Sequence, residues 1–421
     1  MKITIHRGIN QIGGCITEIV SSKTRILIDL GQNLPDNKGV FHDELATSEA
    51  VAKLTKGVDA IFYTHYHGDH IGLFNLVSED IEQYIGKTAK KVALCKHTKL
   101  GQIKGREKLS SAEIKAITTM KTMTEGVSLE IGDMIITPFF VSHSAYESYM
   151  LLVEADGKRI LHTSDFRNHG WLGKGLTKVI KDHIKQVDIL ITEGTMLSRG
   201  DERIRHENQL RQDFIDVMEQ YKNCFVVCSS TDLERLATIY AAHKEAKSAA
   251  PFICDEFQKE VLDIFTDSAG KKSKLFSFDD AITFESRQAK IWESGFTMLV
   301  RCSHKFDEWT DKLLAKIGRD KTVIVFSMWS EYINPLSCHA KKEYLDFIGK
   351  FKNVRKIHTS GHASKDCLTE VCTLTNPTLA IIPIHSAQSD VYLSLPISKE
   401  LKSKVVVQSS FIEDLVIEIV R

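Results

Sequence analysis

The sequence lacks a net charge, a paired-cysteine motif and a long apolar run. Lysine plus arginine and aspartate plus glutamate both number 55, so the overall field cannot attract a polyanion and any nucleic-acid binding must be local. The nine cysteines include no C-x-x-C pair, so neither a disulfide framework nor a zinc ribbon is implied, and a reducing compartment fits best. No apolar stretch approaches the roughly 18 residues of a membrane span, and the N-terminus has no signal-type apolar region. We therefore expect a cytoplasmic protein without a membrane segment.

The length and the composition favour two domains. Hydrophobic residues make up 43% and charged residues 26%, which is near the average of globular proteins and far from disordered compositions. A chain of 421 residues is too long for one ordinary core. We expect either two domains or one domain with a large insertion.

Two patterns of secondary structure follow one another along the chain. The first 165 residues contain short β-rich runs, at 2–5, 15–20, 25–30, 59–64, 134–141, 149–154 and 159–162. Helical periodicity at 43–54 and 111–121 predicts helices over a sheet sandwich. The next part alternates strand-like and helix-like segments, at 188–191, 207–221, 224–228, 233–245, 251–254, 322–326, 341–351 and 354–358. This rhythm predicts an α/β module with a parallel sheet, before tail strands at 379–384, 404–408 and 415–420.

The strongest motif is H-x-H-x-D-H at residues 65–70, directly after the apolar run at 60–63. In an extended segment residues i and i+2 share a face, so His65 and His67 can reach one metal ion, while Asp69 and His70 can reach a second. Without metal, this packing would leave costly polar groups unpaired. Imidazole and carboxylate suit Zn²⁺, with manganese or iron as alternatives. Two ions about 3.5 to 4 Å apart form a two-metal hydrolytic site.

Three further candidate ligands stand at the ends of strand-like runs, namely His143, Asp165 and His385. Any one of them alone is better explained as a hydrogen-bonded core or surface residue. Strand ends on one edge of a sandwich can converge, so together the three residues can complete the surroundings of two metal ions.

The order of these residues, preceded by Asp29 in I-L-I-D-L-G, resembles the five-motif signature of the metallo-β-lactamase superfamily. The resemblance implies an α/β protein with an αβ/βα sandwich. It implies two zinc ions, one held by His65, His67 and His143 and the other by Asp69, His70 and His385. Asp165 would bridge the ions, and Asp29 would order the loop that carries the ligands without being a ligand.

The spacing of the last two ligands is similar to that of one subfamily. Asp165 and His385 are 220 residues apart, whereas small thioesterase and lactonase members place these two ligands much closer. A module of domain size between them resembles the β-CASP nucleases. Glu193, His362 and His385 match that subfamily's motifs A, B and C. The resemblance implies a metallo-β-lactamase domain at 1–195 and 357–421, with a β-CASP insertion at 196–356.

The subfamily motifs also bear on the substrate. A histidine in motif C is typical of RNA-processing members such as ribonuclease J, so His385 favours single-stranded RNA over DNA as the nucleic-acid partner. The chain stops at Arg421, so we expect it to lack the extra C-terminal domain associated with ribonuclease J. Gly194 and Thr195 replace the serine-threonine continuation common after motif A. These departures leave the substrate preference and the assembly state, including a homo-oligomer, open.

The implied reaction is hydrolysis of phosphodiester bonds by a metal-activated hydroxide, with Asp69 and Asp165 among the catalytic groups. We expect His362 to bind the scissile phosphate or to protonate the leaving 3′-oxygen, unless it merely braces the Ser-Gly turn. Glu193 would orient a ligand or His362, unless it is an ordinary strand-end carboxylate.

Substrate phosphates need further hydrogen-bond donors. The candidates at strand-to-helix turns are Ser229, Ser230, Ser360 and Gly361. An equally good interpretation is that Ser230 or Thr231 caps the next helix. Residues 87–108 contain eight lysines and arginines against the single acid Glu107. This segment is either a track for a phosphate backbone or a solvated surface loop, and the two interpretations carry about equal weight.

Two other classes of function compete with the nuclease. A metallo-β-lactamase-fold hydrolase of a small ester, thioester or lactone would share every metal ligand, but it explains neither the insertion nor His362. A nucleic-acid-binding or scaffold protein with a dead metal site would be marked by a missing ligand. All seven ligand positions are filled in this sequence.

Overall fold

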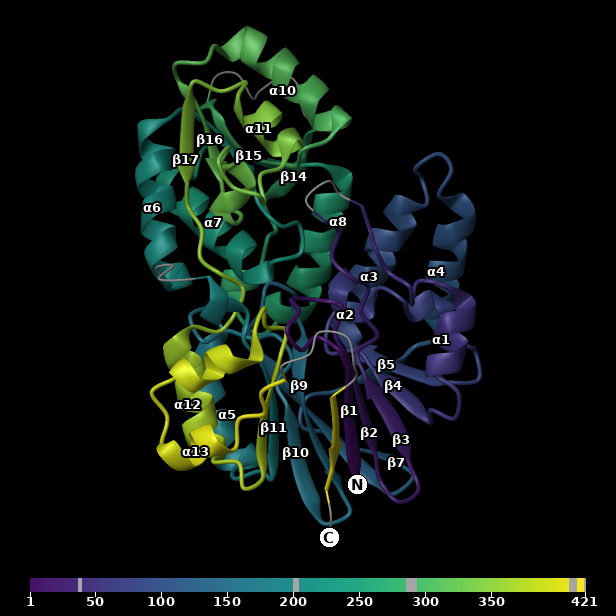
Figure 1. Cartoon of the computed structure of the whole chain (residues 1–421). Coiled ribbons are helices and arrows are strands. Elements are labelled where there is room, and N and C mark those ends of the chain that lie inside the picture. The colour runs from purple at the N-terminus through teal and green to yellow at the C-terminus, as the bar shows by residue number, and fades with distance from the viewer. Residues whose placement is uncertain (37–39, 200–203, 285–293, 409–414, 420–421) are drawn as a thin grey trace. The chain divides into compact units, whose positions relative to one another are not determined.

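A computed structural model describes residues 1–36, 40–199, 204–284, 294–408 and 415–419 (Figure 1). The chain divides into two units, Met1–Glu202 with Gly361–Arg421, and Arg203–Ser360. The second unit is therefore inserted into the first. The divisions lie a few residues beyond the expected boundaries at 195/196 and 356/357.

Two sheets form the frame of the first unit within the described residues. The seven-stranded sheet has the order β19 (Leu415–Glu418), β1 (Lys2–Arg7), β2 (Ile16–Val20), β3 (Arg25–Ile28), β4 (Ala60–Phe62), β5 (Glu82–Gly86) and β6 (Lys121–Met123). The six-stranded sheet has the order β18 (Ala380–Ile384), β11 (Ile189–Glu193), β10 (Lys158–His162), β9 (Ser148–Ala155), β8 (Met134–Val141) and β7 (Leu129–Ile131).

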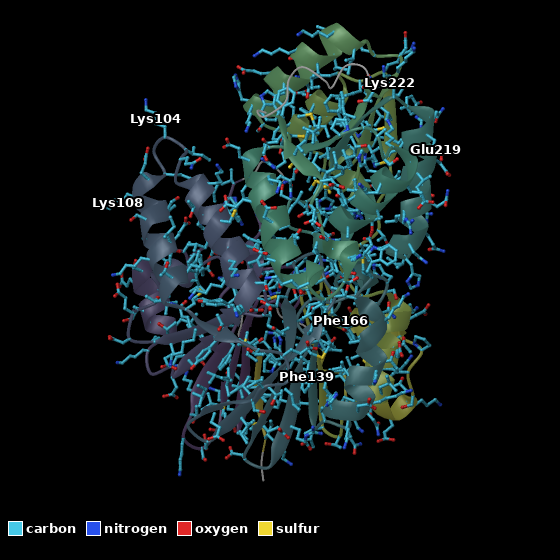
Figure 2. All side chains as sticks on the ribbon, turned by 180° about the vertical axis from the view of Figure 1, so that it is seen from behind. Lys104, Lys108, Phe139, Phe166, Glu219 and Lys222 are labelled. Atoms are coloured by element: carbon cyan, nitrogen blue, oxygen red, sulfur yellow. The ribbon has the colours of Figure 1, made fainter. Side chains whose placement is uncertain are left out.

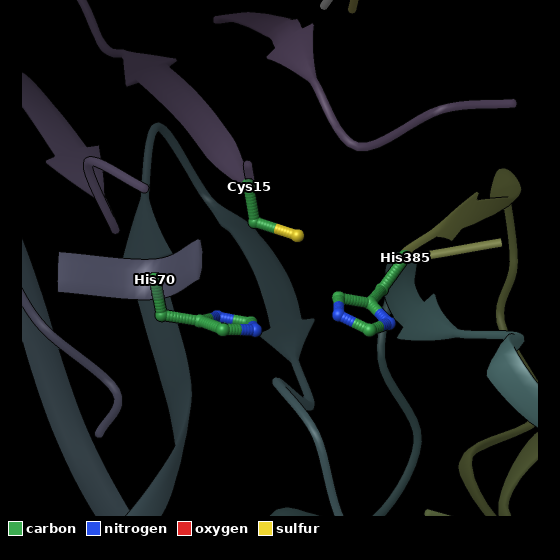
Figure 3. A group of neighbouring side chains, drawn as sticks. All are labelled: Cys15, His70 and His385. Carbon is green, nitrogen blue, oxygen red and sulfur yellow. The ribbon is translucent and has the colours of Figure 1, made fainter. Parts of the chain in front are cut away.

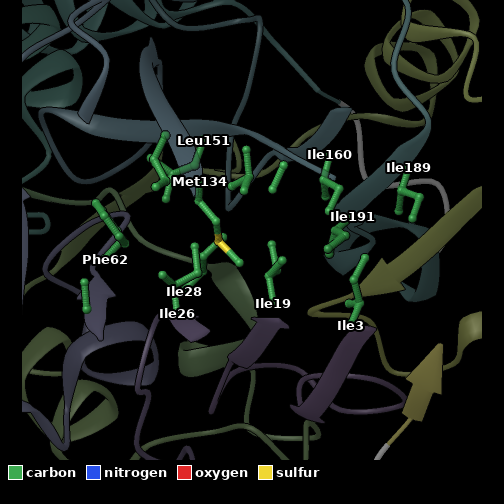
Figure 4. Close-up of a cluster of buried hydrophobic side chains, with 14 of the residues drawn as sticks. Ile3, Ile19, Ile26, Ile28, Phe62, Met134, Leu151, Ile160, Ile189 and Ile191 are labelled. Carbon is green, nitrogen blue, oxygen red and sulfur yellow. The ribbon is translucent and has the colours of Figure 1, made fainter. Parts of the chain in front are cut away.

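A buried cluster joins the two sheets face to face. Side chains alternate along a strand, so Ile26 and Ile28 of β3 share one face, and Leu151 and Val153 of β9 share another. All four belong to this cluster (Figure 4). Burying one such side chain stabilises the fold by about 1.5 to 3 kcal/mol. The sandwich therefore follows from the alternating aliphatic residues of the strands.

Helices cover the sandwich. Those of the first unit are α1 (Ser48–Leu54), α2 (Gly68–Ile71), α3 (Lys87–Leu100), α4 (Glu107–Thr119), α5 (Leu176–Val179), α12 (Lys365–Thr375) and α13 (Lys399–Ser403). Shorter helical turns are η1 (Phe74–Leu76), η2 (Gly173–Gly175), η3 (Ile180–Ile184), η4 (Thr195–Ser198) and η9 (Ser389–Ser394). The second face of the six-stranded sheet packs through Met150 and Leu152 against α5, η3 and α12. This packing gives the helical layer of the six-stranded sheet.

The inserted unit contains a parallel sheet. Its order is β14 (Ala281–Thr283), β13 (Phe252–Cys254), β15 (Phe296–Val300), β12 (Asn223–Val227), β16 (Thr322–Phe326) and β17 (Asn353–Lys356). Its helices and helical turns are α6 (Glu207–Gln220), α7 (Leu233–Ala246), α8 (Glu256–Phe265), η5 (Thr266–Gly270), η6 (Lys274–Phe276), α10 (His304–Ile317), η8 (Ser330–Ile333) and α11 (Lys342–Ile348). Phe225, Met298 and Ile324 on one sheet face pack against Phe306 and Phe347 of α10 and α11. The alternation read from the sequence is thus a parallel α/β unit.

Several local expectations differ from the structure. The helix expected from residue 43 begins at Ser48, because the Thr47 hydroxyl caps it by accepting from the Ala50 N–H. The strand expected at 404–408 is wrong, since this segment makes only an isolated bridge between Val405 and Ile381 within the described residues. Val420, the last residue of the expected terminal strand, lies outside the described residues.

No helix of the described part of the chain is long and apolar enough to cross a membrane.

Candidate metal centre

The H-x-H-x-D-H motif occupies the loop after β4 and the short helix α2. Asp29, in a left-handed backbone conformation with φ of 62°, fixes both ends of this loop. One of its carboxylate oxygens accepts from the Thr64 N–H at 2.8 Å, and the other accepts from His70 Nδ1 at 2.7 Å. Asp29 therefore lies where it orders the loop.

The other ligand candidates lie at the ends of strands, as their positions in the sequence suggested. His143 follows β8, Asp165 follows β10 and His385 follows β18. These strands belong to the same six-stranded sheet, so the turns after them reach one edge. The structure thereby brings three residues that are far apart in the sequence to the loop of His65 and His67.

Hydrogen bonds on the outer ring nitrogens hold the histidines in place. His143 Nδ1 donates to the Gly361 carbonyl at 2.7 Å. His385 Nδ1 hydrogen-bonds the Thr195 hydroxyl at 2.6 Å, and His65 Nδ1 hydrogen-bonds the Thr64 hydroxyl at 3.1 Å. This arrangement turns the opposite nitrogen, Nε2, of each ring toward the centre, as is typical of metal-binding histidines.

The inward-facing atoms surround Asp165. One of its carboxylate oxygens lies 3.2 Å from His70 Nε2, 3.6 Å from His385 Nε2 and 3.8 Å from His143 Nε2. His385 Nε2 is also 3.2 Å from an oxygen of Asp69. The candidate ligand atoms of His65, His67 and His143 lie within 4.8 Å of one another. The geometry thus gives one all-histidine group, of His65, His67 and His143, and overlapping mixed groups, one of which joins His65 and His70 to Asp165.

The donor set fits divalent metal ions. The Nε2 atom of His65 is buried and makes no hydrogen bond within the described residues, and that of His70 is buried against an Asp165 oxygen 3.2 Å away. A buried polar atom without a partner is costly unless another ligand satisfies it. Neutral imidazole and carboxylate in such a cluster are the ligands that zinc and related ions prefer.

Burial and the neighbouring charges set the protonation of the cluster. Burial and the adjacent histidines hold the pKa of His65 well below its usual value, and burial lowers the pKa of His67 to about 4. Burial by itself would raise the pKa of Asp165, but His385, His70 and His362 hold it well below the usual range. Asp165 raises the pKa of His70 and of His385 against the effect of burial, so a metal ion would displace protons there, whereas His65, His67 and Asp165 are already in the forms that bind metal.

Glu193 and His362 form a pair beside the cluster. His362 Nδ1 donates to a Glu193 oxygen at 2.9 Å and lies 3.7 Å from an oxygen of Asp165. The other Glu193 oxygen accepts from the backbone N–H groups of Phe166 at 2.9 Å and Ala363 at 3.2 Å. Glu193 is thus a fully buried carboxylate that connects the strand-end loop at 166 to the His362 turn.

The candidate phosphate-binding serines, Ser229, Ser230 and Ser360, belong to the inserted unit, whereas Gly361 begins the return of the chain into the first unit. The Ser230 hydroxyl accepts from Arg301 at 3.3 Å. The alternative in which Ser230 or Thr231 caps the following helix is wrong. Asp232 is the capping residue of α7, and its carboxylate accepts from the Arg235 N–H at 3.2 Å.

The basic segment at 87–108 is mostly helical and is not a loop. Most of it forms α3, and Lys104 and Lys108 stand at the outer end of the α3 and α4 pair (Figure 2). Lys90 has a structural role, because its ammonium donates to the carbonyls of Thr118 and Met120 at the end of α4. A helix holds its lysine side chains at a regular spacing, whereas a loop would not.

Sequence reasoning missed three residues near the cluster. Thr195 orients His385, as described above. Lys96 on α3 interacts electrostatically with His67 and Asp69, and burial lowers the pKa of its ammonium. The Cys15 sulfur and one nitrogen each of His70 and His385 lie within 4.8 Å of one another (Figure 3). A single cysteine or threonine carries no spacing signal, so the roles of Cys15 and Thr195 could not be predicted from the sequence.

Comparison with known proteins finds a family match and several relatives for part of the chain. Residues 24–221 match the family model described as the beta-lactamase superfamily domain. A stretch of 170 residues is 25% identical to Ribonuclease J of Helicobacter pylori (strain ATCC 700392 / 26695), covering 40% of this chain and 23% of that protein. A stretch of 221 residues is 26% identical to an RNase J-like protein of Methanocaldococcus jannaschii, covering 52% of this chain and 49% of the relative. The chain thus spans half or less of these curated relatives.

One solved structure extends the comparison to the inserted unit. The crystal structure of a protein of unknown function from Enterococcus faecalis V583 has a TM-score of 0.71 at 19% identity and covers 99% of both chains. At this identity the match concerns the fold alone. Together the comparisons confirm the predicted fold class, a metallo-β-lactamase sandwich, which is the fold of a hydrolase superfamily. The chain thus has a segment that matches this domain, and its first unit is interrupted by an α/β unit.

Proposed function

We propose that this protein is a zinc-dependent nuclease of the β-CASP type that hydrolyses phosphodiester bonds of single-stranded nucleic acid, with RNA as the preferred polymer. The observation that carries the proposal is the convergence of histidines and aspartates on Asp165 beside the buried pair of Glu193 and His362. The names of the relatives, Ribonuclease J and RNase J-like protein, support RNA as the substrate. The α/β insertion between Asp165 and His385 supports the β-CASP assignment.

The metal ligands fall into two sets that share Asp165. One ion would be held by His65, His67 and His143, and the other by Asp69, His70 and His385. Bound zinc supplies an activated water at neutral pH and neutralises charge on the phosphoryl oxygens. Manganese is the alternative ion for the same nitrogen and oxygen ligands.

His362 and Glu193 would act on the substrate side of the site. Glu193 accepts the Nδ1 hydrogen of His362, which fixes the orientation of the ring. The ring can then bind an oxygen of the scissile phosphate or give a proton to the leaving 3′-oxygen. Ser229, Ser230, Ser360 and Gly361 are the candidates for holding further phosphates of the strand.

The test is cleavage of end-labelled single-stranded RNA and of matched DNA by the zinc-loaded protein, with 5′-monophosphate and 5′-triphosphate ends. Asp165→Asn should lose at least about a thousandfold in rate, because it removes a carboxylate that both proposed ligand sets would share. His362→Ala should lose about a hundredfold while retaining zinc. His42→Ala, which changes an exposed histidine, is the matched control and should keep the wild-type rate.

The same assay distinguishes the nuclease from the competing small-molecule hydrolase. If neither polymer is cut with zinc or manganese while a small ester, thioester or lactone is hydrolysed, the nuclease proposal fails. Wild-type RNA cleavage by Asp165→Asn would reject the two-metal site. The product ladder, compared with released mononucleotide, distinguishes endonuclease from exonuclease action.

A further inference from the structure

Cys15 lies in the turn between β1 and β2, and its backbone is fixed on both sides. Its N–H donates to the Asp69 carbonyl at 2.9 Å, and its carbonyl accepts from the Gly31 N–H at 3.0 Å. Gly13 and Gly14 before it have φ of 78° and 65°, a region that favours glycine. The side chain is 1% exposed. The position of the sulfur is therefore set by a tight turn that is itself bonded to the helix carrying Asp69.

The Cys15 side chain points toward the space between His70 and His385 (Figure 3). The sulfur and one nitrogen of each ring lie within 4.8 Å of one another. The outer nitrogens of these rings are held by Asp29 and Thr195, so the Nε2 atoms face the same space. His70 Nε2 is fully buried, and the Asp165 oxygen 3.2 Å away does not form a well-aligned hydrogen bond with it.

Other buried cysteines of the chain behave differently. The thiol of Cys224 donates to the Tyr221 carbonyl at 3.6 Å, and that of Cys254 donates to the Ile282 carbonyl at 3.7 Å. For Cys15 no hydrogen bond of the thiol is found in the part of the chain that the structure describes. A buried cysteine often acts as a small apolar residue. Cys15 instead faces two imidazoles and the carboxylates of Asp69 and Asp165, whose charges interact with it.

We propose that the sulfur of Cys15 is a ligand of the metal ion held by His70 and His385, so that the two metal positions differ in chemistry. On binding, a sulfur–metal bond forms and the thiol proton is released to solvent. Burial raises the pKa of the free thiol, but a coordinated thiol is deprotonated outright. A soft sulfur ligand favours zinc over manganese at this position, whereas the group of His65, His67 and His143 offers nitrogen alone.

This inference rests on the proposed metal centre, and cobalt(II) tests both separately. Loading the full chain with cobalt gives visible d–d bands when the ion is bound and a near-ultraviolet charge-transfer band only when sulfur is a ligand. We expect both bands in the wild type. Cys15→Ser should lose the charge-transfer band and keep the d–d bands. Cys338→Ser, which removes an exposed thiol able to take cobalt adventitiously, should keep both.

Metal preference gives a second measurement. Competition between zinc and manganese should shift by about tenfold or more toward manganese in Cys15→Ser, measured as metal content after dialysis against a mixture of the two ions. Cys372→Ser, another buried cysteine of the same unit, is the control for a packing effect and should keep the wild-type preference.

The outcomes are distinguishable. Visible d–d bands without a charge-transfer band in the wild type would overturn the role of Cys15 and leave the metal centre standing. The absence of any cobalt binding would overturn both proposals. If Cys15→Ser does not fold, the wild-type spectrum beside that of Cys338→Ser still decides, because a band that survives in both excludes the exposed thiol.

Discussion

In the first unit, the buried Nε2 of His65 makes no hydrogen bond within the described residues, and the buried Nε2 of His70 has an Asp165 oxygen 3.2 Å away. In the inserted unit, the buried Arg235 donates twice to Glu207, at 2.9 and 3.1 Å, and also to the Ser327 hydroxyl at 2.7 Å. Both regions take charged groups out of water, which is costly. The inserted unit offsets this cost with hydrogen bonds inside the chain, whereas the histidine cluster of the first unit would offset it by binding a metal ion. Buried polar groups therefore mark a functional site only where their partners are missing.

Breaking the satisfied network should give the largest change in stability. Arg235→Met leaves Glu207 buried without its partner and should destabilise the inserted unit by about 3 to 5 kcal/mol. Segment-resolved hydrogen exchange measures this, and metal content should stay at the wild-type level. Lys342→Met, which breaks an exposed ion pair with Asp346, should cost less than about 1 kcal/mol. Equal effects of the two changes would contradict the comparison.

Zinc binding to the histidine and aspartate cluster should stabilise the first unit. Zinc at about 1,000 times its dissociation constant should raise the free energy of unfolding by about 4 kcal/mol, because it binds only the folded cluster. Protection from hydrogen exchange should increase in α2 and in the turns after β8, β10 and β18. Asp165→Asn should remove most of this increase. Equal protection of the inserted unit would show that the ion acts elsewhere.

Acid should destabilise the inserted unit through His243. Burial lowers its pKa to about 4, against about 6.5 in the unfolded chain, so the unfolded state binds the proton first as pH falls. The contribution is therefore fully present above pH 6.5 and is lost between about pH 6.5 and 4, amounting to about 3 kcal/mol. Urea unfolding followed across this range measures it. His243→Gln should flatten the pH dependence, and an unchanged slope would reject the assignment.

The smallest expected effect concerns the orientation of one ligand. Thr195→Val removes the hydroxyl that hydrogen-bonds His385 Nδ1, and it should weaken zinc affinity by about 10 to 100-fold. The fold should be unchanged, since valine nearly matches threonine in volume. Competition with a chelator measures the affinity. Thr369→Val, on the exposed face of α12, is the control and should bind zinc as the wild type does.

The fold class could be predicted because alternating apolar residues encode strands directly. The βαβ rhythm of the inserted unit was equally readable, as β12 and α7 show. The helix in the segment at 87–108 could not be predicted with the same certainty from the sequence, since α3 has a weakly apolar face and no side-chain cap at its start. The strand expected at 404–408 failed because strand formation depends on a neighbouring partner, and only Val405 finds one within the described residues.

The sequence by itself determined the H-x-H-x-D-H cluster, because four candidate ligands within six residues lie close together along the chain. The strand-like runs before His143, Asp165 and His385 also predicted that these residues stand at strand ends. Only the tertiary structure decided that these ends meet around one carboxylate, because the pairing of β8, β9, β10, β11 and β18 is long-range. The positions of Thr195, Lys96 and Cys15 beside the cluster were likewise decided there. A turn held by Gly31 and the Asp69 carbonyl, not a sequence motif, directs the Cys15 sulfur toward His70 and His385.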